Sequence, residues 1–377
     1  MIQGMDSDRL VKQFLEFVKI DSPSFAEARF VEFLTAELKK LGLQVKNDRT
    51  GQHGSGNLLA VLPGTDCQVK PILLCMHTDT VTPGCGIRPR IENGVIRSDG
   101  TTILGVDNKA PIAAALEALR FLQVTSPVHG DVELLFTWGE ERCHQGARAF
   151  DGSGLRSQIG FVPDGGGPLG TLITQTPYYT SIRATFLGKA AHAGIEPEKG
   201  VNALKAAATA ISKMHLGRID EETTTNLGTI AGGMVRNSVP DRVEVEGEAR
   251  SLDVHKMEEQ VRRMRAAMEE GAREVSAKLK VEFVREYEGF RIVDSDLPVR
   301  IATEAAHSMG MIPEITRTCG GSDANNLNTR GIRTIVLGIG AHDFHSPQEH
   351  IAVADLVRLA EFLATLVIEA GRQNRMA

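Results

Sequence analysis

A histidine and an aspartate follow a continuous apolar run in the segment PILLCMHTDTV, residues 71–81. Because the side chains of a strand alternate between its two faces, His77 and Asp79 project to the same side at the strand's end. An imidazole nitrogen and a carboxylate oxygen therefore converge, and both are donors that zinc-type ions accept. The short motif by itself is also compatible with a buried histidine beside an aspartate that caps a turn.

Polar side chains also follow four other predicted strands or their connections. Asp107 comes after SDGTTILG, Glu140 and Glu141 after DVELLFTW, Asp164 after IGFV, and His345 after RTIVLGIGAHDF. Taken singly, these residues also fit a helix cap, a solvated glutamate pair, a turn and a loop histidine. Ligands of open α/β sheets gather at the carboxyl ends of strands, so together the positions indicate one metal site.

The predicted donor set is two histidines, two aspartates and one glutamate: His77, Asp107, Glu141, Asp164 and His345. It suits a pair of divalent ions of the zinc type. Three carboxylates and a bridging hydroxide would balance the four positive charges of the ions. Glu140 is then left beside a ligand as a general base for a metal-bound water, which is the arrangement that a hydrolase needs.

The elements that must position these residues alternate between helix and strand from residue 6 to 176. Helices are predicted over 6–18, 25–42 and 107–122, and strands over 57–64, 71–77 and 131–138. The pattern resumes near the C-terminus with a helix over 297–310, a buried strand over 333–340 and a helix over 353–370. We therefore expect a three-layer α/β domain with a mixed, mainly parallel sheet.

The intervening segment has a different pattern. Strands are predicted over 178–187, 226–233, 241–252 and 281–288, with a helix over 201–216. A second helix carries an apolar stripe of Met257, Val261, Met264, Met268, Val275 and Leu279. The order β-α-β-β-α-β predicts an inserted α+β domain of the ferredoxin-like type. The expected boundaries are 1–177 and 289–377 for the discontinuous α/β domain and 178–288 for the insertion.

Composition and charge exclude several classes of protein. The 377 residues are 42% hydrophobic and 24% charged, which is ordinary for a globular protein, and the net charge of -6 offers no basic surface for nucleic acid or anionic lipid. The N-terminus lacks the pattern of a signal peptide, and no run approaches the ~20 apolar residues of a membrane-spanning helix. The five cysteines form no CxxC pair, and we expect reduced thiols in the cytoplasm.

Five motifs resemble, in order and spacing, those of the dinuclear-zinc metallopeptidases that include tripeptidase T, glutamate carboxypeptidase and aminoacylase: HTDTV, GVDNKA, TWGEER, PDGG and FHSPQE. The peptidase T branch is the most similar. The resemblance covers nearly the whole chain and includes an inserted lid domain with GKAAHAG, RNSVPD and EARSLD. It implies metal-dependent hydrolysis of amide bonds in small peptides, with two divalent ions, most often Zn²⁺, with Mn²⁺ or Co²⁺ as alternatives.

The resemblance also implies roles for the metal-site residues. Asp107 would bridge the two ions, His77 and Asp164 would complete one site, and Glu141 and His345 would complete the other. Asp79 would orient His77, and Glu140 would act as the general base. A cis peptide is expected at Asp107-Asn108.

In the lid, the resemblance implies that His192 stabilises an oxyanion, often from a partner subunit. Arg250 and Asn237 would bind a substrate carboxylate or a nearby polar group. We also expect a homodimer through the inserted domain, with the EVEGEAR strand and a helix offering the pairing edge.

The chain departs from the family pattern after its two glutamates, where Arg142, Cys143, His144 and Gln145 precede Gly146. His144 is expected at the rim of the pocket, and the GGSD loop with Ser322 and Asp323 is expected to line a cleft. The alternatives are an N-acyl amino acid deacylase or a dipeptidase of the same family. A noncatalytic metal-containing scaffold and a nucleotide-binding α/β protein are alternatives of other classes, although no phosphate-binding glycine motif follows a strand.

Overall fold

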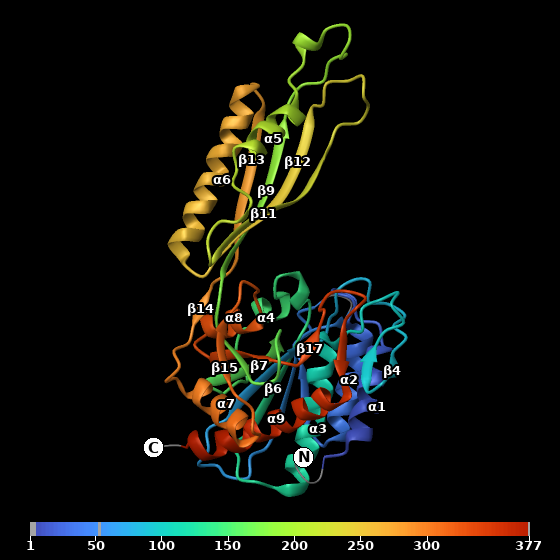
Figure 1. Ribbon diagram of the computed structural model, residues 1–377, viewed down its shortest axis with the longest axis vertical. Helices are drawn as coiled ribbons and strands as arrows, with labels where there is room; N and C mark the ends of the chain where they lie inside the picture. The colour runs from blue at the N-terminus through green and yellow to red at the C-terminus, as the bar shows by residue number, and fades with distance from the viewer. Residues whose placement is uncertain (1–4, 52–53, 376–377) are drawn as a thin grey trace. The chain divides into compact units, whose positions relative to one another are not determined.

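A mixed sheet of nine strands organises the larger of two units in the computed structural model, which describes residues 5–51 and 54–375 (Figure 1). The first unit contains residues up to 175 together with 291–317 and 322–377, and the second contains 176–290 and 318–321. Among the described residues, no helix has both the length and the apolar content needed to span a bilayer.

The nine strands run in the order β1-β2-β6-β3-β7-β16-β8-β14, with β15 paired to β8. The parallel pairs are β3 with β6 and β7, β7 with β16, and β8 with β15. The predicted mixed sheet is therefore confirmed. The bounds are β1 Gln44–Asn47, β2 Leu58–Leu62, β3 Ile72–His77, β6 Val132–Thr137, β7 Ile159–Gly165, β8 Thr171–Thr176, β14 Phe290–Arg291, β15 Glu314–Arg317 and β16 Arg333–Gly338.

Helices in two groups pack against this sheet. In one group α3 contacts β3, β7, α1 and α9, and α7 contacts β16 and α9, whereas in the other α4 and α8 contact each other and strands β6, β7 and β16. The apolar residues that the sequence spaces at helical intervals, such as Leu10, Phe14 and Phe17 of α1, face this core and are buried. The helices are α1 Ser7–Val18, α2 Ala28–Lys40, α3 Val106–Thr125, α4 Gln145–Ala149, α7 Leu297–Ser308, α8 Asp323–Thr329 and α9 Val353–Gln373.

A small second sheet of the first unit was not expected from the sequence. Its order is β17-β18-β5-β4, with β4 Arg90–Glu92, β5 Val95–Arg97, β17 Ala341–His342 and β18 His350–Ala352. Asn93 and Gly94 join β4 to β5 with positive φ at both residues, as a two-residue hairpin requires. This sheet holds the segment between β17 and β18, which contains His345.

The second unit is a ferredoxin-like sandwich, as predicted. Its sheet has the order β10-β11-β12-β9-β13, and helices α5 and α6 pack on it over a core of alanines, valines and methionines. The elements are β9 Tyr178–Leu187, α5 Ala203–Ser212, β10 Gly217–Arg218, β11 Thr223–Gly232, β12 Arg242–Ser251, α6 Val254–Glu274 and β13 Lys278–Tyr287.

Two expectations about this unit are wrong. The EVEGEAR segment belongs to β12, which pairs with both β11 and β9 and so offers no open edge. The apolar stripe was predicted to lie on one long helix, but α6 ends at Glu274, before the last two residues of the stripe. A left-handed Ser276 turns the chain, and Leu279 lies in β13, although Val275 and Leu279 still pack against the same core.

Candidate metal centre and active site

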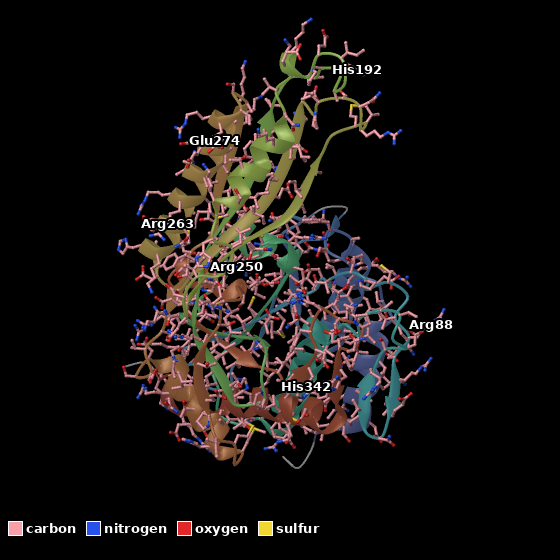
Figure 2. All side chains as sticks on the ribbon, turned by 45° about the horizontal axis from the view of Figure 1, so that its top comes forward. Arg88, His192, Arg250, Arg263, Glu274 and His342 are labelled. Atoms are coloured by element: carbon pink, nitrogen blue, oxygen red, sulfur yellow. The ribbon has the colours of Figure 1, made fainter. Side chains whose placement is uncertain are left out.

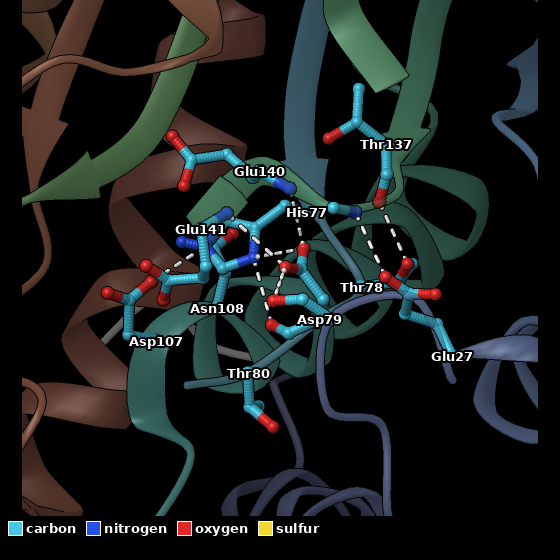
Figure 3. Close-up of polar contacts among 12 residues, drawn as sticks. Glu27, His77, Thr78, Asp79, Thr80, Asp107, Asn108, Thr137, Glu140 and Glu141 are labelled. Atoms are coloured by element: carbon cyan, nitrogen blue, oxygen red, sulfur yellow. Dashed lines mark hydrogen bonds and ion pairs between the residues drawn. The ribbon is translucent and has the colours of Figure 1, made fainter. Parts of the chain in front are cut away.

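Five side chains from separate elements of the first unit converge, and they are the five predicted ligands. His77 ends β3, Asp107 lies at the start of α3, Glu141 lies in a 3₁₀ turn over Glu140–Arg142, Asp164 lies near the end of β7, and His345 follows β17. His77, Asp107 and Glu141 are drawn in Figure 3. The expected cis peptide at Asp107-Asn108 is confirmed.

The carboxylate of Asp107 lies between the two imidazoles. Its Oδ1 is 2.8 Å from Nε2 of His77, and its Oδ2 is 3.2 Å from Nε2 of His345. Asp164 Oδ1 lies 3.4 Å from the same nitrogen of His77, and Glu141 Oε1 lies 3.2 Å from that of His345. Two groups of donors therefore share Asp107, one with His77 and Asp164 and one with Glu141 and His345.

The electrostatics of these side chains fit divalent cations. Burial raises the pKa of Asp164 well above its usual value, and the nearby charge of Asp107 raises it further. Burial and the charge of Asp107 likewise raise the pKa of Glu141. Hydrogen bonds to Asp107 and Glu141 raise the pKa of His345 to about 10. Carboxylates crowded at low solvent access need positive charge nearby, and a pair of metal ions would provide it.

Asp79 organises the neighbouring loop as well as His77. Its backbone oxygen lies 3.0 Å from Nδ1 of His77, and its Oδ1 lies 3.3 Å from the same nitrogen. The carboxylate also accepts hydrogen bonds from the backbone N–H of Glu140 at 2.9 Å and of Glu141 at 3.2 Å (Figure 3). It accepts another from the hydroxyl of Ser24 at 2.7 Å. Burial opposes ionisation of Asp79, but its contacts with His77 and Ser24 outweigh burial and lower its pKa.

Glu140 has a different environment from its neighbour Glu141. The residue is 7% exposed, and its side chain points away from Asp79 in Figure 3. Burial raises its pKa well above the usual value, and the charge of Asp164 adds to the effect. His144 Nε2 lies 3.3 Å from Glu140 Oε1. His144 is only 4% exposed, so its expected place at the rim is wrong.

Two supporting residues, Glu349 and Asn108, were not identified from the sequence. Buried Glu349 accepts a hydrogen bond from the N–H of Gly105 at 2.6 Å and so holds the turn that precedes Asp107. The side-chain amide of Asn108 donates to Asp164 Oδ1 at 2.8 Å. The one sequence feature that could have pointed to Glu349 is its position four residues after His345. That feature is not sufficient, because a single buried glutamate has no distinctive sequence pattern.

The expectation for the GGSD loop is wrong for its last residue. Asp323 begins α8 and is 1% exposed, so it does not line a cleft. It accepts a hydrogen bond from the hydroxyl of Thr137 at the end of β6. Burial raises the pKa of Asp323 to about 6.

The three predicted substrate residues belong to the second unit. His192 and Asn237 lie together in two exposed loops, where the N–H of Ala193 donates to the carbonyl of Asn237 at 3.0 Å. Arg250 lies toward the other end of this unit from His192 (Figure 2). Its guanidinium donates twice to Glu248, at 2.9 Å each, and stacks over Tyr179.

Comparisons with known proteins agree with this fold and identify the family. The model of peptidase family M20/M25/M40 matches residues 73–369. The solved structure of aminopeptidase PepT from Bacillus cereus is 42% identical, with a TM-score of 0.87 over 97% of this chain and 99% of that one. A tripeptidase structure from Staphylococcus aureus is 36% identical, with a TM-score of 0.92 over 98% and 100%. Peptidase T of Brevibacillus brevis is 25% identical over 95% of this chain and 97% of the relative.

These similarities exclude the scaffold and nucleotide-binding alternatives, because the chain matches a peptidase family, and it matches an aminopeptidase structure and a tripeptidase structure over almost their whole length. The chain therefore belongs to peptidase family M20/M25/M40, in its peptidase T-like branch, and is a hydrolase.

Proposed function

We propose that this chain hydrolyses amide bonds in small peptides as a metal-dependent exopeptidase, with tripeptide aminopeptidase activity as the first expectation. The sharing of Asp107 between two donor groups carries this proposal. The names of the two similar solved structures, an aminopeptidase and a tripeptidase, support the substrate class. The cytoplasm remains the predicted compartment.

His77, Asp107 and Asp164 would hold one divalent ion, and Asp107, Glu141 and His345 would hold the other. Zn²⁺ suits this mixture of imidazole and carboxylate donors, with Mn²⁺ and Co²⁺ as alternatives. Bound there, the ions would polarise the scissile carbonyl and acidify a water molecule. Asp79 would keep His77 oriented through its ring nitrogen Nδ1.

Glu140 would move the proton in this reaction. Its carboxylate would take a proton from the attacking water and then give it to the nitrogen of the leaving amine. Its buried setting favours the protonated form that the second step requires, because burial disfavours the charge. A competing arrangement groups Glu140 with His77 and Glu141 as donors, so the role of Glu140 needs a direct test.

The two adjacent glutamates give that test. Glu140→Gln should keep two bound ions per chain while kcat falls by ~100- to 10,000-fold, the usual contribution of a general acid or base. Glu141→Ala should lose metal, with an affinity loss beyond the ~10- to 100-fold of residues that only support ligands. Metal content and kcat on the best amide substrate are measured for both, with exposed Glu304→Gln as the control. Loss of metal in Glu140→Gln would instead support the competing arrangement.

A substrate panel distinguishes the related activities. Tripeptides, dipeptides and N-acyl amino acids are offered to protein loaded with Zn²⁺, Mn²⁺ or Co²⁺. Turnover of tripeptides supports the proposal, whereas turnover of N-acyl amino acids or dipeptides alone would replace it with a deacylase or dipeptidase. Absence of hydrolysis with every metal would refute it.

For the second unit we propose roles as a lid and as a homodimer interface. His192 is exposed and would stabilise the oxyanion, and Asn237 beside it would bind a polar group of the substrate. Arg250 would bind a substrate carboxylate. Its guanidinium already donates to Glu248, so it would have to bind both carboxylates at once.

The edge of β11 is the pairing edge that we propose for the dimer. In the described part of the chain, β10 pairs with β11 at Thr224 and Thr225, and the N–H of Ile219 donates to the carbonyl of Thr223, which leaves the edge over 226–232 open. Its residues NLGTIAG carry no charge, and Ile230 is 52% exposed. The other outer strand, β13, carries Lys278, Lys280 and Glu282 among its exposed residues, and charged edges resist pairing.

A further inference from the structure

His144 occupies a costly backbone conformation beside Glu140. Cys143 and His144 have φ of 64° and 56°, in the left-handed region that residues with a Cβ rarely adopt. The His144 N–H donates to the carbonyl of Glu140 at 2.7 Å, and the His144 carbonyl accepts from Arg148 at 2.9 Å. This conformation places the imidazole in the interior, where its side chain is 5% exposed.

The two ring nitrogens of His144 have different partners. Nε2 lies 3.3 Å from Oε1 of Glu140, and Nδ1 lies 3.3 Å from the side-chain nitrogen of Asn326 in α8. An amide nitrogen can only donate, so Nδ1 is the acceptor and the ring hydrogen lies on Nε2. Asn326 is itself 8% exposed, and a capping box at Ser322 and Asn325 fixes the start of its helix.

We propose that His144 is a positioning residue for the reaction: a hydrogen bond from its Nε2 holds Oε1 of Glu140, and Asn326 fixes the tautomer that can donate. This inference rests on the proposed function of Glu140. With Oε1 occupied, Oε2 is the oxygen that takes the proton from water and gives it to the leaving amine. His144 stays neutral throughout and transfers no proton.

The arrangement distinguishes this role from metal binding. His144 belongs to none of the donor groups that could hold an ion among the described residues, and Nδ1 is occupied by an amide donor. If the Glu140 side chain were free to adopt several rotamers, the rotamer that reaches the water molecule would be only partly populated, and the reaction would be slower. Removal of the Nε2 donor should therefore lower kcat and leave substrate and metal binding unchanged.

The test compares three variants of the metal-loaded enzyme. His144→Leu removes the donor, and His144→Gln places an amide N–H close to the position of Nε2. His129→Gln is the control, because His129 is also buried, at 2% exposure, and lies at the opposite end of strand β6 from the site. His144→Leu should lower kcat by about 10- to 100-fold, with KM within roughly threefold and two ions retained. His144→Gln should recover most of that loss, and His129→Gln should show none.

A second measurement does not depend on activity. The ¹⁵N chemical shifts of the imidazoles report which nitrogen of each histidine carries hydrogen, and the signals of His144 are those missing from His144→Gln. The Nε2–H tautomer is expected, and the Nδ1–H tautomer would overturn the inference. Equal kcat values for the Leu and Gln variants, a kcat of His144→Leu at the wild-type level, or loss of its metal would also overturn it. If the wild-type enzyme hydrolysed no amide, the proposed function would be refuted instead. The tautomer measurement would still test the hydrogen bond from His144 to Glu140.

Discussion

Replacement of Asp79 by Asn should weaken metal binding although Asp79 is not a proposed ligand. The carboxylate accepts from the N–H groups of Glu140 and Glu141 and from Ser24, and it contacts His77. The Asn side chain has only one acceptor oxygen. Its NH₂ group would therefore face one of the hydrogen-bond donors that the second carboxylate oxygen now accepts from. A hydrogen bond to a charged group contributes ~1.5–3 kcal/mol, and each 1.4 kcal/mol is a factor of ten. Loss of one such bond predicts metal binding that is about 10- to 150-fold weaker.

Chelator competition on the purified protein measures this affinity, and Glu133→Gln is a matched control. The side chains of Asp79 and Glu133 are both 0% exposed. Glu133 accepts from the N–H groups of Arg156 and Ser157, toward the other end of β6 from the site. Both variants should lower the melting temperature, and only Asp79→Asn should lower metal affinity. Equal metal loss in both variants would show that general destabilisation is the cause and would refute the reasoning.

Three further predictions concern assembly and stability. Ile230→Lys at the open edge of β11 should shift the proposed homodimer to monomer in sedimentation or light scattering, and a dimer that persists would exclude this edge. Burial opposes ionisation of Asp131, but the N–H of Gly64 and a neighbouring arginine outweigh it and lower its pKa from 3.8. Its stabilisation is thus present above pH 3.8 and lost as the pH falls through the lower folded-state pKa. Asp131→Asn should lower the free energy of unfolding by ~1 kcal/mol at pH 7, and the difference should vanish in acid. A Cβ at Gly371 would lie 2.1 Å from the carbonyl oxygen of Val128, so Gly371→Ala should lower the free energy of unfolding by ~1–3 kcal/mol in denaturant titrations.

The sequence predicted most of the fold because its patterns are local and regular. The continuous apolar run of β3 predicts a strand that is buried on both faces, and all six of its residues are buried. Strict alternation in β9 and β12 predicts strands with one covered face, which is how they lie. The donor positions could be located for the same reason, because four of them lie at or just beyond the end of a predicted strand.

Other features depend on contacts that no local pattern encodes. The EVEGEAR segment has the alternation of any half-buried strand, and only the pairing order places it in the interior of the sheet. His144 follows two glutamates in a polar stretch, and its burial comes from left-handed backbone and from Asn326, which is remote in sequence. His345 was expected at the end of β16, whereas the small sheet β17-β18 holds it. The dipeptide Asn93-Gly94 is typical of a hairpin turn and so indicates the β4-β5 hairpin. It does not indicate that β17 and β18 pair with this hairpin.

The parallel pairing of β7 with β16 has a consequence for biosynthesis. The whole contiguous part of the second unit is encoded between these two strands, so the ribosome releases β7 with one side paired to β3 and the other side still open. Domains fold as units while the chain emerges, and the second unit can fold during this interval. Four of the five proposed ligands are already synthesised by then, whereas His345 follows both the second unit and β16 in the chain. A nascent chain therefore cannot complete the proposed metal site before the second unit and β16 have been synthesised.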